Sequence, residues 1–419
     1  MLKKIKDNFY YLGVIDKALK VFDVIMETKY GTSYNSYLVK TKNHNILIET
    51  VKVSFFDEYI KNLNEIVGVE NIDTIIVNHT EPDHAGSIEK LLMLNPNITI
   101  IGSKSAILYL KNITNKSFNS QVVKPNQEII FDDKTFQFIS APFLHWPDSI
   151  YTYIKEDEVL FTCDSLGTHY AFDEVFLSKM NKTLYKDYLE SFQYYYDAIF
   201  APYKKFVLQA LDKIKDLKIK MICNGHGPIL DENIQFYLDT YKKWSTVYNP
   251  FDKLIVIPYA TSYGYTKIMA EKIAQGIKNY DDTIDIHLYN LNVSNYKALE
   301  QQIVSDIYYA DGVLFGSTTI NKDATPVIWD LVINMNAIIH QGKFVTTFGS
   351  YGWSGEGVDN IQTRLKNASL KVLPSFKLKF KPSLENEIML EKYGEELAEA
   401  IFSKKIQVQL INDEKVTMS

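Results

Sequence analysis

The chain has 419 residues, 46% of them hydrophobic, and this length predicts two or three domains that each bury a core of their own. Its 45 Lys and Arg against 51 Asp and Glu give a net charge of -6 at pH 7, and such mild acidity argues against a nucleic-acid partner. Two cysteines exclude a disulfide scaffold and a cysteine-ligated metal cluster, and the lack of a long apolar run or a secretory signal predicts a cytoplasmic protein without a membrane partner.

Short apolar runs in the first 250 residues predict a domain of many short strands with helices between them. Several of these strands end at loops that contain histidine, and strand ends hold such loops firmly enough to build a site. Cys163 and Cys223 both lie in apolar runs, so we expect buried, reduced thiols. The predicted strands are Tyr37–Val39, Asn45–Glu49, Thr74–Val77, Ile98–Ile101, Thr135–Ile139, Ile150–Ile154, Val159–Phe161 and Met221–Cys223.

After Asn249-Pro250 the pattern changes to strands that alternate with helices, which predicts a doubly wound parallel sheet. The expected domains are therefore residues 1–250 and 251–403, followed by a polar C-terminal tail at 404–419. An amphipathic helix is expected at about Lys267–Lys278. The predicted strands of this second domain are Lys253–Ala260, Ile284–Tyr289, Gly312–Phe315, Phe344–Phe348 and Lys371–Phe376.

Two imidazoles and two carboxylates lie within six positions directly after the apolar run Ile75–Val77. They are His79, Glu81, Asp83 and His84. Without a cation, burying them together would cost several kcal/mol for each unpaired charge, so their place at the end of a buried strand indicates a metal site. The alternative interpretation is a polar turn that solvent covers.

Three more residues with metal-ligating side chains follow apolar strands further along the chain, namely His145, Asp164 and His226. The complete series, His-x-Glu-x-Asp-His followed by His, Asp and His, resembles the metal motif of the metallo-β-lactamase fold. Zinc hydrolases of that fold usually have histidine at the position of Glu81. Four imidazoles and three carboxylates suit iron in redox chemistry, but zinc also accepts carboxylates, so charge alone leaves the metal open.

The loop that follows the strand Lys253–Ala260 predicts a phosphate-binding site. Hydroxyls, backbone N–H groups and the positive end of a helix dipole converge there, without a lysine or arginine. The loop matches neither the P-loop motif nor Gly-x-Gly-x-x-Gly, which disfavours nucleoside triphosphates and dinucleotides. The candidate residues are Thr261, Ser262, Tyr263, Gly264, Tyr265 and Thr266.

Two later strand-end loops should meet the first one at the carboxyl edge of the sheet, the usual ligand crevice of an open α/β fold. Tyr351 and Trp353 could flank a flat ring, although ordinary turns with surface aromatics give the same pattern. The order of the three loops resembles the FMN site of flavodoxin, over about Asp252–Ser403. The additional candidate residues are Ser317, Thr318, Thr319, Asn321, Ser350, Tyr351, Gly352, Trp353 and Gly355.

A β-lactamase-like domain with this ligand series, followed by a flavodoxin-like domain, resembles the flavodiiron protein family, also called A-type flavoproteins, over essentially the whole chain. The resemblance implies an N-terminal metallo-β-lactamase-like αββα sandwich, a C-terminal flavodoxin-like parallel sheet, FMN and two non-haem iron ions. Thr318 departs from the family pattern, which often has proline there. The resemblance also implies that one iron is bound by His79, Glu81 and His145, the other by Asp83, His84 and His226, and both by a bridging Asp164.

The implied reaction is the reduction of O2 to water, of NO to N2O, or of both. FMN would accept electrons singly from an external carrier such as a rubredoxin, because the sequence has no Cys-x-x-Cys pair of its own. The resemblance implies a head-to-tail homodimer, or a dimer of dimers, that brings one subunit's flavin beside its neighbour's irons. It also predicts that Tyr195 or Tyr196 lines the gas pocket, although a structural tyrosine is equally plausible. His169, which stands five residues after Asp164, is predicted to lie next to a metal ligand.

Two other functions remain compatible with the sequence. The first is a zinc-dependent hydrolase of the metallo-β-lactamase fold that carries a flavodoxin-like module. The second is an electron carrier or gas sensor whose metal site is vestigial, although the complete ligand series argues against decay. The sequence does not decide between O2 and NO.

Overall fold

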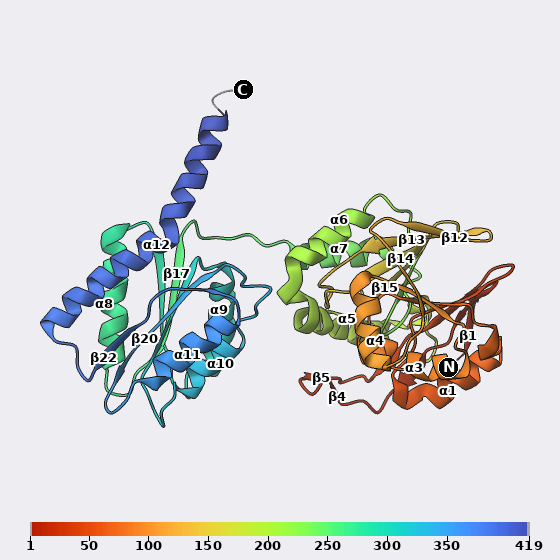
Figure 1. Cartoon of the computed structure of the whole chain (residues 1–419), viewed down its shortest axis with the longest axis horizontal. Helices are drawn as coiled ribbons and strands as arrows, with labels where there is room; N and C mark the ends of the chain where they lie inside the picture. Colours follow the sequence, from red (N-terminus) through yellow and green to blue (C-terminus); the bar gives the residue numbers. More distant parts are fainter. Residues whose placement is uncertain (1, 417–419) are drawn as a thin grey trace. The chain divides into compact units, whose positions relative to one another are not determined.

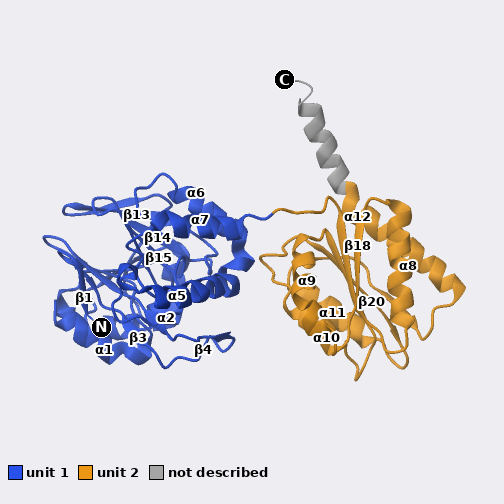
Figure 2. Ribbon diagram, turned by 180° about the vertical axis from the view of Figure 1, so that it is seen from behind, with its two compact units in different colours: residues 1–247 blue, residues 248–419 orange. Residues whose placement is uncertain are grey.

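The computed structural model describes residues 2–416, with the side chains of residues 2–403, and it divides the chain into two compact units (Figure 2). The units are residues 1–247 and 248–419, so the division falls three residues before the predicted boundary. The predicted polar tail at 404–419 lies outside the residues whose side chains are described.

The first unit is built on two large sheets and two small hairpins. One large sheet has the order β1-β2-β7-β8-β9-β10-β11 and the other has β12-β13-β14-β15-β16, while β3 pairs with β6 and β4 with β5. The strands are β1 (Lys3–Lys6), β2 (Phe9–Tyr11), β3 (Val14–Asp16), β4 (Val21–Phe22), β5 (Met26–Glu27), β6 (Thr32–Tyr34), β7 (Tyr37–Lys40), β8 (Asn45–Ile48), β9 (Thr74–Val77), β10 (Thr99–Gly102), β11 (Asn119–Val122), β12 (Glu128–Phe131), β13 (Lys134–Ser140), β14 (Ile150–Ile154), β15 (Val159–Cys163) and β16 (Met221–Asn224).

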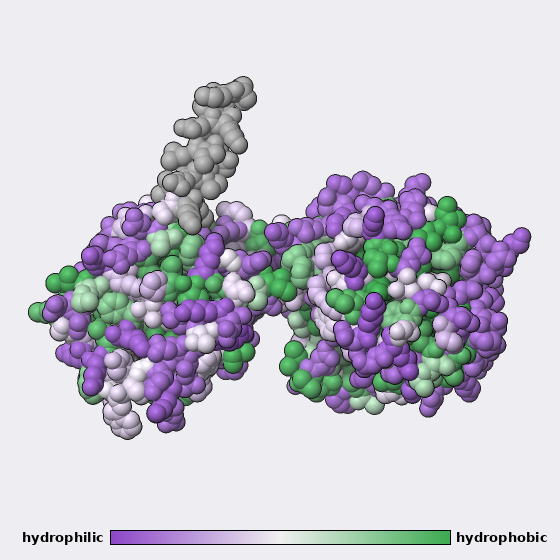
Figure 3. Space-filling model, viewed as in Figure 1, coloured by the Kyte–Doolittle hydropathy of each residue, from purple (hydrophilic) through white to green (hydrophobic). Residues whose placement is uncertain are grey.

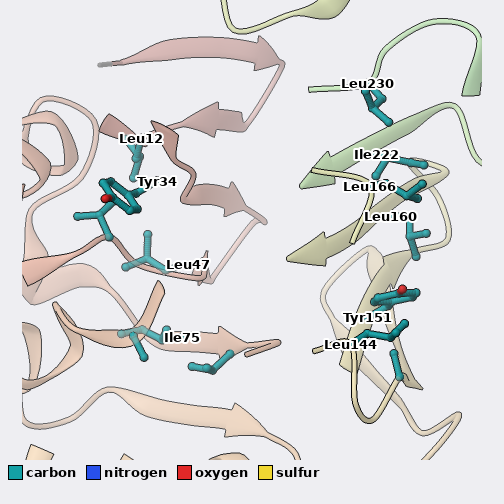
Figure 4. Packing of buried hydrophobic residues seen from close by; sticks show 14 of the residues in the cluster. Leu12, Tyr34, Leu47, Ile75, Leu144, Tyr151, Leu160, Leu166, Ile222 and Leu230 are labelled. Atoms are coloured by element: carbon teal, nitrogen blue, oxygen red, sulfur yellow. The ribbon is translucent and has the colours of Figure 1, made fainter. Parts of the chain in front are cut away.

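The two large sheets pack face to face because alternate side chains of their strands are apolar on both faces. Phe161 of one sheet contacts Phe9 and Tyr37 of the other, with ring centroids 5.7 and 5.4 Å apart. The opposite faces, which carry Leu47 and Leu160, pack against helices. Figure 4 shows these two side chains on their strands. These helices are α1 (Phe56–Asn64), α3 (Ile88–Leu94), α4 (Lys104–Thr114), α5 (Lys182–Tyr195), α6 (Lys204–Ile214) and α7 (Ile234–Ser245).

The second unit is one parallel sheet with helices on both faces (Figure 1). The strand order β18-β17-β19-β20-β21 reverses between β17 and β19, and β22 also pairs with β20. On β17, Leu254 and Val256 enter one core and Ile255 and Ile257 the other, as the two-residue repeat of a strand requires. The elements are β17 (Leu254–Ala260), α8 (Tyr265–Tyr280), β18 (Asp285–Asn290), α9 (Tyr296–Tyr309), β19 (Gly312–Ser317), α10 (Pro326–Ile333), β20 (Phe344–Tyr351), α11 (Glu356–Asn367), β21 (Lys371–Val372), β22 (Phe376–Lys379) and α12 (Leu384–Val416).

One predicted strand is wrong as a single element. Residues 371–376 contain all of β21 (Lys371–Val372) and the first residue of β22 (Phe376–Lys379), with an interruption between them that contains Pro374. Proline has no backbone N–H to donate to a neighbouring strand, so the ladder breaks there and resumes at Phe376.

Polar side chains cover most of the face of each unit that Figure 3 shows, with smaller apolar patches between them. Among the described helices, none combines the length and the apolar character that crossing a bilayer requires. Cys163 and Cys223 are both buried and form no disulfide, as expected from their apolar surroundings.

Candidate metal centre and flavin-binding loops

Loops at the ends of neighbouring strands bring the seven predicted metal ligands together in the first unit. His79 and Glu81 follow β9, and the short helix α2 (Pro82–Ala85) carries the next two ligands. His145 lies in the turn between β13 and β14, Asp164 directly follows β15, and His226 lies two residues after β16. Since β15 and β16 are parallel neighbours, their carboxyl ends present these last two residues at the same edge.

The seven side chains form two adjacent groups. The ligand atoms of His79, Glu81, His145 and Asp164 lie within 4.8 Å of one another, and so do those of Asp83, His84 and His226. Asp164 reaches both groups, because its Oδ1 lies 2.9 Å from His84 Nε2 and its Oδ2 lies 3.4 Å from His145 Nε2. The seven side chains that the sequence resemblance implies as ligands therefore lie close together, with Asp164 between the two groups.

The chemistry of this donor set fits a pair of cations. Both carboxylate oxygens of Asp83 and Oδ2 of Asp164 are buried without a hydrogen-bond partner, which is costly for an ionised group in the absence of a positive charge. Burial lowers the pKa of His226, but the carboxylates of Asp164 and Asp83, 3.4 and 3.1 Å from its Nε2, outweigh burial and raise this pKa to about 10. Bound cations would take the place of such protons on the imidazoles.

Polar groups behind the ligands fix the orientation of two imidazoles. His79 Nδ1 lies 3.4 Å from Asp148 Oδ1, and Asp148 Oδ2 accepts hydrogen bonds of 2.8 Å from both the backbone N–H and the hydroxyl of Thr80. His226 Nδ1 lies 2.7 Å from the backbone carbonyl of Ser33. Such contacts hold a ligand's ring in place and select the nitrogen that binds metal. Neither residue is predicted from the sequence, although Asp148 stands only three residues after His145; Ser33 belongs to no motif.

The structure separates the two candidate pocket tyrosines. Tyr195 is buried, and its ring lies 4.8 Å from His169 and 6.1 Å from His226 in edge-to-face contacts. The Tyr196 hydroxyl instead lies 2.7 Å from Ser245 Oγ at the end of α7. The two side chains diverge where α5 gives way to a wider π-helical turn at Tyr196–Phe200, a feature often found at functional sites.

His169 also lies beside the metal centre, as predicted. Its ring centroid is 4.7 Å from that of His226, and its Nδ1 lies 2.8 Å from Thr32 Oγ1. Burial and the nearby His226 hold the pKa of His169 well below its usual range, so its imidazole is neutral. It therefore adds no positive charge beside the ligands.

In the second unit, the three predicted flavin loops leave the carboxyl ends of β17, β19 and β20, which are adjacent and parallel. The backbone N–H of Ser350 donates to Thr266 Oγ1 (3.4 Å), and the N–H of Thr318 donates to the carbonyl of Ala260 (3.2 Å). These bonds tie the loops together beside the reversal of strand order between β17 and β19, the usual position of a ligand in such sheets.

Three features of the loops suit a phosphate and a flat ring. Gly264 has a φ of 83° and immediately precedes α8, and no atom lies within 4 Å of the position that a Cβ would take there. Tyr263 and Trp353 are 84% and 98% exposed, and the buried hydroxyl of Thr319 has no hydrogen-bond partner. A helix N-terminus with hydroxyls and free aromatic faces fits FMN.

Both units match known protein families. Residues 32–227 match a family described as ODP family beta lactamase, and residues 257–392 match flavodoxin, which confirms the predicted fold class. Two solved structures are similar over 96% of the chain: rubredoxin oxygen:oxidoreductase from Desulfovibrio gigas (TM-score 0.60, 25% identity, 99% of that chain) and a flavoprotein from Thermotoga maritima (TM-score 0.60, 27% identity, 98% of that chain).

Curated relatives extend along nearly the whole chain. Flavo-diiron protein FprA2 of Clostridium acetobutylicum is 40% identical over 95% of this chain and 99% of its own length. The anaerobic nitric oxide reductase flavorubredoxin of Salmonella typhi is 33% identical over 94% of this chain and 81% of its own length. With both domain families in the same order and this identity over the full length, the chain belongs to the flavodiiron protein family.

Proposed function

We propose that this protein is an oxidoreductase that reduces O2 to water, NO to N2O, or both, at two non-haem irons supplied with electrons through FMN. The observation that carries the proposal is the pair of ligand groups that share Asp164, with buried carboxylate oxygens that have no hydrogen-bond partner. When bound, FMN supplies one-electron transfer, and the iron pair supplies binding and multi-electron reduction of the gas.

In this proposal His79, Glu81 and His145 hold one iron, and Asp83, His84 and His226 hold the other. Asp164 bridges the two, because its oxygens face an imidazole from each group. Tyr195, rather than Tyr196, lines the gas pocket. Support for this choice comes from the Tyr195 ring beside His226 and from the Tyr196 hydroxyl beside Ser245.

The flavin phosphate binds at the N-terminus of α8, among Thr261, Ser262 and Gly264. The loops after β19 and β20 enclose the ring, with Tyr351 or Trp353 against its face. The exposed Trp353 is available for this contact. Hydroxyls and N–H groups suit the terminal phosphate of FMN, as they do in other phosphate sites without lysine.

The electron donor is proposed to be a separate rubredoxin-type protein. Two similar proteins are named flavorubredoxin and rubredoxin oxygen:oxidoreductase, which supports this donor class. The cytoplasmic location, the head-to-tail homodimer or dimer of dimers, and the division into residues 1–250, 251–403 and 404–419 likewise remain proposals. A zinc hydrolase with a flavodoxin-like module is disfavoured, because the curated relatives over the whole chain carry redox names.

Purified protein provides the test. We expect about two irons and one FMN per chain, in line with the ligand count, and consumption of O2 or NO over many turnovers when a reduced rubredoxin is supplied. Gas electrodes under anaerobic starting conditions measure kcat/KM for each gas and so rank the two. Two zinc ions per chain, hydrolytic activity without flavin and no gas consumption would overturn the proposal in favour of the hydrolase.

A further inference from the structure

Each of the two ligand groups takes its members from both large sheets of the first unit. In the first group, His79 and Glu81 follow β9 of one sheet, whereas His145 precedes β14 and Asp164 follows β15 of the other. The second group likewise combines two residues of α2, which comes after β9, with one residue that comes after β16. The spacing of the two sheets at this edge therefore decides whether either group can close around an ion.

A buried chain of hydrogen bonds joins the two sheets directly beside these ligands. Glu49 Oε1 accepts from the backbone N–H of Asn78 (2.8 Å), and Asn78 Oδ1 accepts from the hydroxyl of Thr152 (2.6 Å). The backbone carbonyl of Asn78 also accepts from the N–H of Ile150 (2.9 Å). Glu49 directly follows β8 and Thr152 belongs to β14, whereas Asn78 immediately precedes the first ligand, His79. All three bonded side chains are buried, and we call them the Glu49–Asn78–Thr152 bridge.

The residue after Glu49 holds the other end of the same ligand segment. The N–H and the hydroxyl of Thr50 both donate to the backbone carbonyl of His84, at 2.8 and 2.5 Å. Glu49 and Thr50 thus fix the segment from Asn78 to His84 at both ends, and this segment carries four of the seven ligands. The first sheet therefore holds the segment firmly, and Thr152 is the side chain that connects it to the second sheet.

Stability alone does not account for a glutamate at position 49. Its φ angle is 57°, a left-handed conformation that is unfavourable for a residue with a long side chain. Its Oε2 is also buried without a hydrogen-bond partner, which costs free energy that an apolar side chain would not lose. Backbone strain and unsatisfied polar groups are found mainly at functional sites, so Glu49 is expected to serve the adjacent metal centre.

We propose that the Glu49–Asn78–Thr152 bridge sets the spacing of the two sheets at the metal centre, and that Glu49 and Thr152 are positioning residues for both ions. The Glu49 carboxyl group holds Asn78 on the first sheet, and the Thr152 hydroxyl ties the same residue to the second sheet. Neither side chain is a ligand, because each acts through the backbone that precedes His79. Groups behind the ligands commonly control metal affinity in this way. This inference rests on the proposed metal pair.

The test compares cobalt(II) binding to metal-free wild type, Thr152→Val and the control Thr114→Val, without any measurement of turnover. Valine has nearly the shape of threonine but lacks the hydroxyl. Thr114 is also buried, and its hydroxyl donates to the carbonyl of Leu110 (2.8 Å) in α4, which carries none of the ligands. We expect affinity for cobalt to fall about tenfold in Thr152→Val, with an altered visible spectrum, because the ligands no longer meet at the same spacing. Thr114→Val should match wild type in both readouts, even where urea unfolding shows that the two variants lose similar stability.

Two variants of Glu49 separate its hydrogen bond from its charge. Glu49→Gln keeps an oxygen that can accept from the Asn78 N–H, whereas Glu49→Leu has a similar size and no acceptor. We expect Glu49→Gln to retain the cobalt affinity and the spectrum of wild type. Glu49→Leu should show the same losses as Thr152→Val.

Equal cobalt affinities and spectra in Thr152→Val and Thr114→Val would overturn the inference. It would also be overturned if Glu49→Gln were as impaired as Glu49→Leu, because the charge of Glu49 and not its hydrogen bond would then matter. If Glu49→Leu does not fold, the comparison of the two threonine variants still decides. A wild-type protein that binds no pair of ions would instead contradict the proposed function on which the inference rests.

Discussion

At the scale of single residues, we expect Asp148, which lies behind a metal ligand, to raise the affinity of the site for metal. It lies behind His79 and is held by two hydrogen bonds from Thr80. Asp148→Asn keeps the shape but removes the negative charge that favours a metal-binding His79. We expect metal affinity to fall about 10- to 100-fold, as measured by titration of the metal-free protein with cobalt(II).

A matched control is Asp157→Asn. Asp157 is also a carboxylate of the first unit, but it pairs with Lys134 Nζ at 2.7 Å in the turn between β14 and β15. Its substitution should leave the cobalt affinity unchanged. Equal losses in the two variants would show that Asp148 acts only through general charge or stability.

His340 makes the stability of the second unit depend on pH, and this effect does not involve the metals. Burial and the nearby Lys343 lower its pKa from 6.5 to about 4. The unfolded chain therefore binds more protons than the folded unit between these values. We expect the contribution of neutral His340 to the free energy of unfolding to be complete above pH 6.5 and to be lost as the pH falls toward 4. Urea unfolding should show that the free energy of unfolding of the second unit rises with pH between 4 and 6.5 in wild type, and rises less in His340→Gln. An identical rise in the two proteins would contradict a lowered pKa of His340.

Residue types at strand ends made the metal centre predictable, but not its surroundings. All seven predicted ligands follow apolar strands, and the structure brings all seven together. Asp148 and Ser33 were missed because their function depends on where the fold places them. Ser33 contributes a backbone carbonyl, which any residue type could provide. The choice between Tyr195 and Tyr196 likewise depends on a π-helical turn that adjacent tyrosines do not reveal.

At the scale of elements, the start of α8 combines a special backbone with a predicted phosphate site. Gly264 adopts a φ of 83°, which costs an L-residue roughly 1 kcal/mol. Gly264→Ala should therefore weaken FMN binding about fivefold, because the loop keeps this conformation to hold the phosphate. Fluorescence quenching of added FMN by the flavin-free protein measures the change.

Gly342→Ala is the matched control for this substitution. Gly342 has a φ of 79° but precedes β20, at the edge of the sheet opposite the flavin loops. Alanine there should destabilise the unit by a similar amount and leave FMN affinity unchanged. If both variants lost FMN equally, the effect would come from general destabilisation of the unit and not from the phosphate loop.

Regular elements of the second unit were easier to predict than those of the first. The long apolar run Leu254–Ala260, for example, became a buried strand followed by a helix. The hairpin of β4 and β5 gave no signal, because each strand has two residues and its turn lacks glycine. Pro374 divided one predicted strand, a local effect that apolar periodicity does not record.

At the scale of the whole molecule, the proposed head-to-tail dimer predicts that two inactive variants restore each other. Glu81→Ala removes a metal ligand, and Ser262→Glu places a negative charge where the flavin phosphate binds. In a mixed dimer, the intact flavin of one subunit lies beside the intact metal centre of the other. Random exchange of subunits should therefore restore about a quarter of wild-type gas consumption.

Native mass spectrometry of the mixture verifies that the subunits have exchanged. Each variant alone should remain inactive. If mixed dimers form and gas consumption stays at the level of the separate variants, the flavin does not serve the neighbouring subunit, and the head-to-tail arrangement is wrong.

The most direct test of the central claim is a single-turnover comparison of wild type with Glu81→Ala, both loaded with FMN and reduced without oxygen. Each is mixed rapidly with NO or with O2, and flavin absorbance is followed while iron content is determined on the same samples. We predict rapid flavin reoxidation in wild type and a rate at least about 100-fold slower in Glu81→Ala, because the electrons then lack an intact metal pair to enter. Equal reoxidation rates in the two proteins would show that the flavin alone reacts with the gas, and would contradict a metal pair built from these seven side chains.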